Sequence, residues 1–391
     1  MRGLTILFFL VSFAHYSNGQ QSKYWGQLVK GEFEVGYQDT VLLNYDQNYS
    51  LGEYTGPKPY FVNIWFPTNS KLGKKIVYND YLKLTSPAGI ESLTDSIGQV
   101  QMASFINWAV TYNLDLWEND SLTDSKIGLA KKMLQQRLDV FKTSKYPVAH
   151  YPTIIYHHGN GGIPFENSVL FEFLASHGFV VISADYHWPN LRERSYTHES
   201  NRSLEDVDFI AGFSNTLPFT DRHNTTYIGH SWGGGVALRL NQKGNVNFKR
   251  YIIFDSTLEK AGLEEMKVTN PYLDSLLQNH PSDFKTNTII ITARGRYYEN
   301  GKPVIQPYPE FISFEKLDKR VFTYITLKQI LNHGSFTNVE VMRSVFSKDF
   351  LQNDAMTVNE QFETYQFLVR LTKEILDDNK INKKQLIIND K

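Results

Sequence analysis

The sequence contains no cysteine: none of its 391 residues can form a disulfide, carry a lipid on an N-terminal thiol, or serve as a thiol nucleophile. It also has no marked charge imbalance, since 40 Lys and Arg stand against 41 Asp and Glu. A formal net charge of −1, with the basic residues dispersed, gives no reason to expect nucleic acid or an anionic membrane surface as a partner.

Long hydrophobic runs are also scarce, and the N-terminal one is typical of an export signal. Arg2 is followed by apolar residues 4–14 and then by Ser17-Asn18-Gly19, which predicts a signal peptide over residues 1–19. The apolar stretch is shorter than the ~20 residues of a spanning helix. We therefore expect a secreted or periplasmic protein with no integral membrane segment after cleavage. Export without cysteine favours a bacterial source.

The chain does contain one nucleophile-elbow motif, Gly-His-Ser-Trp-Gly at residues 229–233, directly after the apolar pair Tyr227-Ile228. In this motif a serine occupies a strained turn between a strand and a helix, and its hydroxyl projects from the end of a sheet. Glycines are needed because the helix packs closely on the strand. Ser231 is therefore the predicted nucleophile, and a plain glycine-rich turn is the alternative.

A second glycine-rich motif, His-Gly-Asn-Gly-Gly at residues 158–162, follows the apolar run 153–157. An H-G-x-G loop at the end of a strand lets backbone N–H groups face inward as an oxyanion hole. The expected donors are the amide of Asn160 in this loop and the amide of Trp232 at the start of the elbow helix.

A serine nucleophile needs a histidine base, which in this arrangement comes late in the chain. Only His280 and His333 follow Ser231. His280 ends a helix-like stretch and is followed by proline, which indicates a surface position at a helix C-terminus. His333 lies in a turn-like loop after the last predicted strand, residues 321–327, and is the predicted base.

The acid of the triad has two candidate positions. The predicted strand 251–254 ends directly on Asp255, whereas the next strand, 288–292, is followed by no carboxylate until Glu299. We choose Asp255, with Glu299 as the alternative. A carboxylate at Asp255 could instead cap the turn that follows it.

The order of apolar runs predicts strands alternating with helices, and so a mostly parallel central sheet covered by helices on both faces. Residues 20–391 are expected to form one domain. Residues 80–145 form a helical insertion between early strands, with helix-like pieces at 102–116 and 126–141. Its aromatic residues either line a lid over the site or pack on the domain; they are Phe105, Trp108, Tyr112 and Trp117. A terminal helix is expected over residues 373–391.

No cofactor or metal is required by this chemistry. His157 and His158 are adjacent, so in a strand they point to opposite faces, and no carboxylate spacing completes a zinc motif around them. One of the two is expected to support the oxyanion loop.

The chain contains His-Gly-Asn-Gly at residues 158–161, Leu-Ala-Ser-His-Gly-Phe-Val-Val at 174–181, and Gly-His-Ser-Trp-Gly-Gly at 229–234. Together these stretches resemble the platelet-activating factor acetylhydrolase and dienelactone hydrolase-like branch of the α/β-hydrolases. The resemblance implies the α/β-hydrolase fold over roughly residues 30–340. In the acetylhydrolase subgroup the acid follows the strand after the elbow, where Asp255 stands. Dienelactone hydrolases proper use a cysteine nucleophile, which this chain lacks.

The predicted function is a serine carboxylic-ester hydrolase that acts through an acyl-enzyme on short or medium acyl esters or on lipid esters. A serine peptidase or amidase on the same fold is one alternative, because the triad alone does not separate ester from amide. A catalytically silent binding protein is the other.

Overall fold

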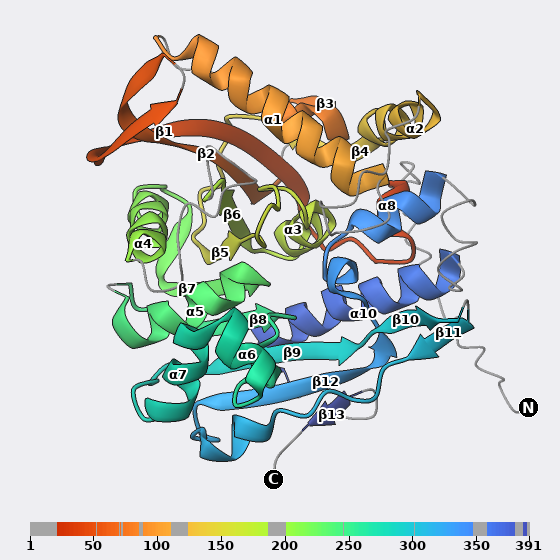
Figure 1. The fold of residues 1–391 in the computed structure, drawn as a ribbon. Coiled ribbons are helices and arrows are strands. Elements are labelled where there is room, and N and C mark those ends of the chain that lie inside the picture. The colour runs from red at the N-terminus through yellow and green to blue at the C-terminus, as the bar shows by residue number, and fades with distance from the viewer. Residues whose placement is uncertain are drawn as a thin grey trace, which may run out of the picture.

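The computed structural model describes residues 22–51, 53–69, 71, 73–85, 89–110, 124–186, 201–244, 246–300, 302–346, 358–379 and 386–388. The predicted signal peptide lies outside these residues. The described part is built on one 11-stranded sheet with helices on both faces (Figure 1). The strand order is β13-β12-β9-β8-β7-β5-β6-β2-β1-β4-β3.

The six central strands run parallel, as the sequence predicted. They are β5 (Tyr151–His157), β6 (Val180–Ala184), β7 (Thr220–His230), β8 (Arg250–Phe254), β9 (Thr288–Arg294) and β12 (Phe322–Ile330). The outer strands are β1 (Glu34–Leu51), β2 (Tyr54–Thr68), β3 (Lys74–Val77), β4 (Arg137–Lys142) and β13 (Leu386–Ile388). A separate hairpin follows β9, formed by β10 (Arg296–Glu299) and β11 (Lys302–Ile305). Because the C-terminal ends of parallel strands meet at one edge, the loops after β5, β7, β8 and β12 lie together there.

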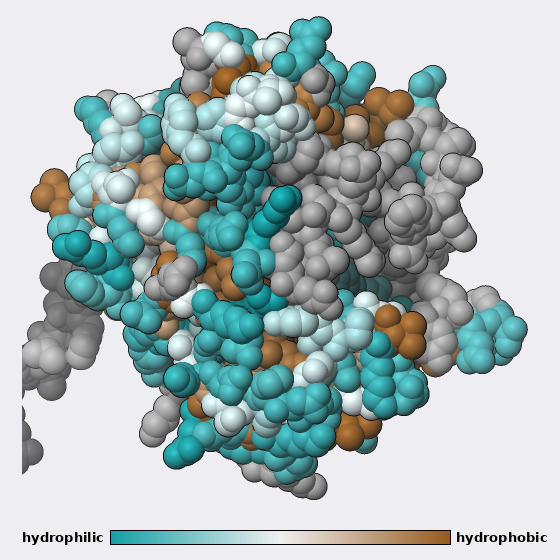
Figure 2. Space-filling model, turned by 60° about the vertical axis from the view of Figure 1, so that its left-hand side comes forward, coloured by the Kyte–Doolittle hydropathy of each residue, from teal (hydrophilic) through white to brown (hydrophobic). Residues whose placement is uncertain are grey.

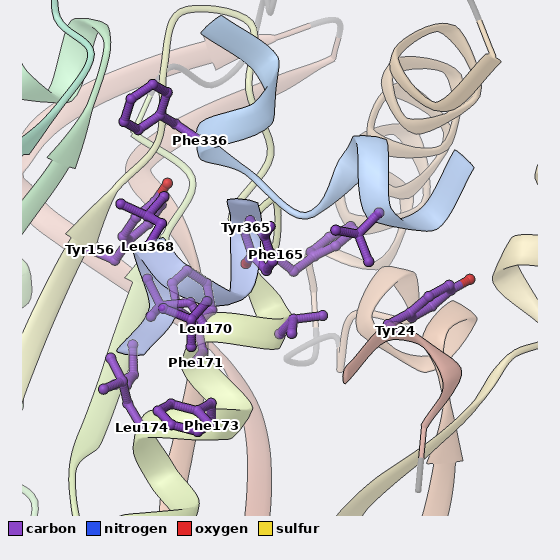
Figure 3. Packing of buried hydrophobic residues seen from close by; sticks show 14 of the residues in the cluster. Tyr24, Tyr156, Phe165, Leu170, Phe171, Phe173, Leu174, Phe336, Tyr365 and Leu368 are labelled. Carbon is purple, nitrogen blue, oxygen red and sulfur yellow. The ribbon is translucent and has the colours of Figure 1, made fainter. Parts of the chain in front are cut away.

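The central strands are apolar on both faces because both faces are covered. On one face Ile252 packs in a core with α3 (Ser168–Ser176), α8 (Val339–Phe346), α10 (Val358–Leu376) and η1 (Lys23–Trp25). Figure 3 shows this core. On the other face Ile253 packs in a core with α4 (Arg202–Ser214), α5 (Trp232–Lys243), α6 (Glu264–Thr269) and α7 (Pro271–Asn279). The described residues also include short 3-10 helices: η2 (Tyr78–Leu82), η3 (Leu258–Lys260), η4 (Ile312–Lys316) and η5 (His333–Phe336).

The insertion between early strands is only partly helical. Residues 91–134 hold α1 (Glu91–Val110) and α2 (Asp124–Leu134), but the helix predicted over 126–141 is wrong beyond Leu134. Residues 137–142 form β4, which pairs with β1 and β3. Leu138 and Val140 are buried and Asp139 between them is partly exposed. Burial thus alternates from one residue to the next, as it does in a strand.

The aromatic residues of the insertion were expected either in a lid or against the domain. Phe105 is fully buried in the core, with its ring centroid 5.5 Å from that of Tyr78. Phe105 therefore packs on the domain. Tyr112 and Trp117 lie outside the described residues, and the side chain of Trp108 is not among those described.

The C-terminal segment differs from the helix expected over residues 373–391. The last described helix, α10, ends at Leu376, and residues 386–388 form β13, antiparallel to β12. The run Leu386-Ile387-Ile388 is short and apolar, and it covers the hydrogen-bonding edge that β12 would otherwise expose.

The surface is mixed. On the face in Figure 2, apolar side chains occur in small patches between polar ones. Within the described ranges, no helix has both the length and the apolar character to cross a membrane.

Candidate active site

Ser231 occupies the turn between β7 and α5. Its φ of 52° and ψ of −111° lie in a region that non-glycine residues rarely adopt, so the turn is strained. The Ser231 amide donates to the carbonyl of Phe254 at 3.0 Å, which holds the turn against the end of β8. A Cβ at Gly233 would overlap the carbonyl oxygen of His157, and one at Gly229 would overlap the backbone of Gly233. The glycines thus allow α5 to approach β5 and β7 closely.

Asp255 and His333 are brought together by the loops after β8 and β12. The Nδ1 of His333 lies 2.8 Å from Oδ2 of Asp255. The carboxylate is fixed to β9, because Thr292 Oγ1 donates to Oδ1 at 3.3 Å and the Asp255 amide donates to Ile291 O at 2.9 Å. Asp255 also has a positive φ, 38°, so this site holds a second strained residue beside Ser231.

The partners of His333 decide where its proton sits. An ionised carboxylate only accepts, so Nδ1 carries the proton and the lone pair of the neutral ring is on Nε2. Burial alone would lower the pKa of His333, but the hydrogen bond and charge of Asp255, with the charges of Glu166 and Glu259, outweigh it and raise the pKa above its ordinary value. The ring is still 40% exposed, so solvent screens part of this effect.

The elbow and the histidine loop are in direct contact. The ring of His230, the residue before Ser231, lies 4.8 Å from the ring of His333, and its Nε2 is 3.2 Å from the His333 carbonyl oxygen. Among the residues that the structure describes, no hydrogen bond links the Ser231 hydroxyl to His333. In substrate-free sites such bonds are often long and tighten only on binding.

The loop at residues 158–162 stands beside the serine. A Cβ built on Gly159 would lie 3.2 Å from Ser231 Cβ. The Gly159 carbonyl accepts from Gly162 N at 3.1 Å and from His158 Nδ1 at 2.7 Å. His158 Nε2 in turn accepts from the amide of Tyr186 at 3.3 Å, so the ring is the Nδ1–H tautomer. The adjacent His157 also contacts this loop, since its Nδ1 lies 2.8 Å from the carbonyl oxygen of His158.

The two amides expected in an oxyanion hole belong to the 158–162 loop and to the start of α5. Asn160 is exposed at the tip of the 158–162 loop, and Trp232 is the first residue of α5. The carbonyl of Gly159 is engaged by two donors within its own loop. The Gly159 carbonyl and the Asn160 N–H belong to the same peptide unit. The two hydrogen bonds to the carbonyl therefore also fix the direction of the Asn160 N–H.

A buried carboxylate that sequence reasoning missed connects these parts. Glu166 is 2% exposed and its Oε1 accepts from Tyr156 Oη at 2.9 Å, from Gly159 N at 3.2 Å and from His230 Nδ1 at 3.1 Å. Burial would raise the pKa of Glu166, but the hydrogen bond and charge of His230, together with the hydrogen bond from the Tyr156 hydroxyl, lower it. The available signal was an acidic residue directly after the apolar residues 163–165 that follow the loop.

The remaining candidates lie elsewhere or play other parts. Glu299, the alternative acid, is exposed at the end of β10 and stands opposite Lys302 in the hairpin. His280 caps α7, as the sequence predicted.

A further buried carboxyl, Glu259, is close enough to influence His333. Burial, and then the charge of Asp255, raise the pKa of Glu259 to about 7. Within the described ranges, no three His, Asp or Glu side chains gather in a group that could hold a metal ion.

Neither a family model nor a curated protein matches this chain. Among solved structures, a ferulic acid esterase from Streptomyces cinnamoneus matches over 91% of this chain and 96% of its own, with 14% sequence identity and a TM-score of 0.55. This chain and that esterase share a fold. A propionate-bound thermophilic esterase from Thermogutta terrifontis matches over 60% of this chain and 86% of its own, with 16% identity and a TM-score of 0.40. At such identities the likeness concerns the fold alone.

Proposed function

We propose that this protein is a serine carboxylic-ester hydrolase whose triad is Ser231, His333 and Asp255. The observation that carries the proposal is the 2.8 Å contact between His333 Nδ1 and Asp255, on loops that flank the strained turn of Ser231. This arrangement leaves Nε2 of His333 as the basic nitrogen, and its ring adjoins the elbow. The fold shared with an esterase is consistent with this assignment.

The reaction follows from these roles. His333 Nε2 takes the proton of the Ser231 hydroxyl as Oγ attacks the acyl carbonyl, and Asp255 stabilises the imidazolium that forms. The tetrahedral intermediate collapses when His333 gives its proton to the leaving alkoxide, which leaves an acyl group on Ser231. Water, deprotonated by His333, then attacks the acyl-enzyme and frees the acid.

The oxyanion of each intermediate is held by the amides of Asn160 and Trp232 in this proposal. The support is the rigid loop: Gly159 is bonded through both its N–H and its C=O, and it lies against Ser231. Donors fixed before the reaction need no reorganisation when charge develops. In comparable sites one such donor contributes roughly 10²- to 10³-fold to kcat.

We place the protein in the platelet-activating factor acetylhydrolase and dienelactone hydrolase-like branch. The position of Asp255 after the strand that follows the elbow supports this placement. The substrates would be short or medium acyl esters or lipid esters, and the protein would be exported after loss of residues 1–19. In this proposal the helical part of the insertion, α1 and α2, would cover the acyl chain as a lid.

The test is the hydrolysis rate across p-nitrophenyl esters of increasing acyl length, for the wild type, Ser231→Ala and a control, Ser275→Ala on α7. We expect turnover that disappears only in Ser231→Ala, together with labelling of the wild type by a fluorophosphonate. A peak at acetyl would indicate a small-acyl site, and a peak at long chains a lid-covered lipid site. Labelling without ester turnover would favour the peptidase or amidase. If neither labelling nor turnover is seen, a silent binding protein is favoured.

A further inference from the structure

His230 stands between two hydrogen-bond acceptors. Its Nδ1 is 3.1 Å from Glu166 Oε1 and its Nε2 is 3.2 Å from the carbonyl oxygen of His333. A carboxylate and a carbonyl oxygen only accept, and a neutral imidazole has a single N–H. Both contacts are within hydrogen-bond distance, so the ring of His230 bridges the Glu166 side chain and the backbone of the His333 loop. The His230 and Glu166 side chains are 6% and 2% exposed, so this contact is buried next to the nucleophile.

The same carboxylate holds the oxyanion loop. Glu166 Oε1 accepts from the amide of Gly159, and a Cβ at Gly162 would overlap Oε2, so the loop closes around this side chain. The hydroxyl of Tyr156, on β5, also donates to Oε1. A single buried oxygen thus joins β5, the oxyanion loop and the residue before Ser231.

The segment that carries Glu166 also holds the loop of His333. The backbone carbonyl of Glu166 accepts from the amide of Asn338 at 3.1 Å. The next residue, Asn167, is buried and donates from Nδ2 to the carbonyl of Phe336, the last residue of η5, at 2.9 Å. Figure 3 shows Phe336 and Tyr156 in the same buried cluster. The histidine loop is therefore held from its start by His230 and from its end by residues 166–167.

We propose that Glu166 and His230 are a positioning pair, which sets the oxyanion loop and the His333 loop against the nucleophile elbow. The pair touches no reacting atom. It acts through Gly159 on one side and through the His333 backbone on the other. This inference builds on the proposed function, since it assigns these two residues to the same site.

The experiment measures kcat and KM on one p-nitrophenyl ester for Glu166→Gln, His230→Asn and the double variant, each rate divided by the active sites titrated with a fluorophosphonate. The matched control is Glu172→Gln, since Glu172 is also buried and also accepts from a tyrosine hydroxyl, that of Tyr81 at 2.9 Å. We expect each single variant to lose roughly 10- to 100-fold in kcat per active site, because small displacements in a reacting site have effects of that order. KM and the control should not change.

Two further readouts separate positioning from general stability. The affinity of a boronic acid, which mimics the tetrahedral intermediate, should fall in parallel with kcat. The double variant should lose no more kcat than the less active of the two single variants, because the two residues act as one unit. Unchanged kcat per titrated site would overturn the proposal, as would losses that multiply. The same holds if neither variant folds while Glu172→Gln does, because the pair would then be a determinant of folding.

A failure of this pair differs from a failure of the proposed function. If the wild type neither hydrolyses esters nor labels with the fluorophosphonate, the serine hydrolase assignment is wrong. If the wild type is active and Ser231→Ala is not, yet Glu166→Gln retains the full kcat, only the positioning pair is wrong.

Discussion

Asp255 and His333 are 78 residues apart in the chain, and their side chains meet at 2.8 Å. β9 separates the strands that precede them, and it also provides Thr292, whose hydroxyl donates to the second carboxylate oxygen. The acid is thus anchored by the sheet on one oxygen and faces the histidine with the other. This relationship has a direct consequence for pH dependence.

If His333 is the base, only its neutral form accepts the serine proton, so kcat/KM should rise with pH through the pKa of His333. Asp255 raises this pKa against the opposing effect of burial, and the acid limb should therefore lie above the ordinary histidine value. In Asp255→Asn the limb should move to lower pH while kcat falls about 10⁴-fold, as the ring loses its tautomer. The measurement is kcat/KM from pH 5 to 9.

Glu299→Gln is the control for that profile, because Glu299 is exposed on the β10–β11 hairpin. It should leave both the limb and kcat unchanged. An unmoved acid limb in Asp255→Asn, or an equal loss in Glu299→Gln, would contradict the assignment of the acid.

Alanine in place of a glycine should have opposite effects at the elbow and at an exposed position on a helix. A Cβ at Gly233 overlaps the His157 carbonyl, which is backbone and cannot rotate away, so Gly233→Ala should lower the free energy of unfolding by about 1–3 kcal/mol and reduce ester turnover. A Cβ at Gly212, inside α4, meets nothing within 4 Å. Gly212→Ala should raise the free energy of unfolding by about 0.5–1 kcal/mol with turnover unchanged. Urea unfolding measures both, and equal effects would refute the packing argument.

Glu172 should make stability depend on pH. Burial raises its pKa to about 7, although Trp25 and Tyr81 hydrogen-bond to the carboxylate. As pH rises, the unfolded state, with a pKa of 4.5, releases this proton at a lower pH than the folded state does. The resulting stabilisation is fully present below the unfolded pKa and is lost as pH rises through about 7, by an amount on the order of 3 kcal/mol.

Glu172→Gln mimics the protonated carboxyl and should remove this component. The check is the difference in free energy of unfolding between wild type and variant, measured by urea denaturation from pH 5 to 8. The variant should gain relative to the wild type as pH rises. A constant difference across that range would show that Glu172 titrates normally in the folded state.

Much of the fold was predictable because the relevant signals are local. The apolar runs at residues 153–157, 251–254 and 288–292 are strands because a strand buried on both faces needs a continuous apolar sequence. The position of His280 at the end of α7 was predicted for a similar local reason. Residues 137–142 were misassigned to a helix because their two-residue burial period appears only when β1 and β3 lie beside them.

The sequence by itself determined that Ser231 would follow a strand in a glycine-rich turn, since only glycines at positions 229 and 233 let α5 pack so closely. It also set the chain order of serine, carboxylate candidates and late histidine. Only the tertiary structure brought Asp255, and not Glu299, to His333, and only it showed Glu166 between three loops. Such contacts depend on the order of strands in the sheet, which joins residues distant in the chain and leaves no periodic signal along it.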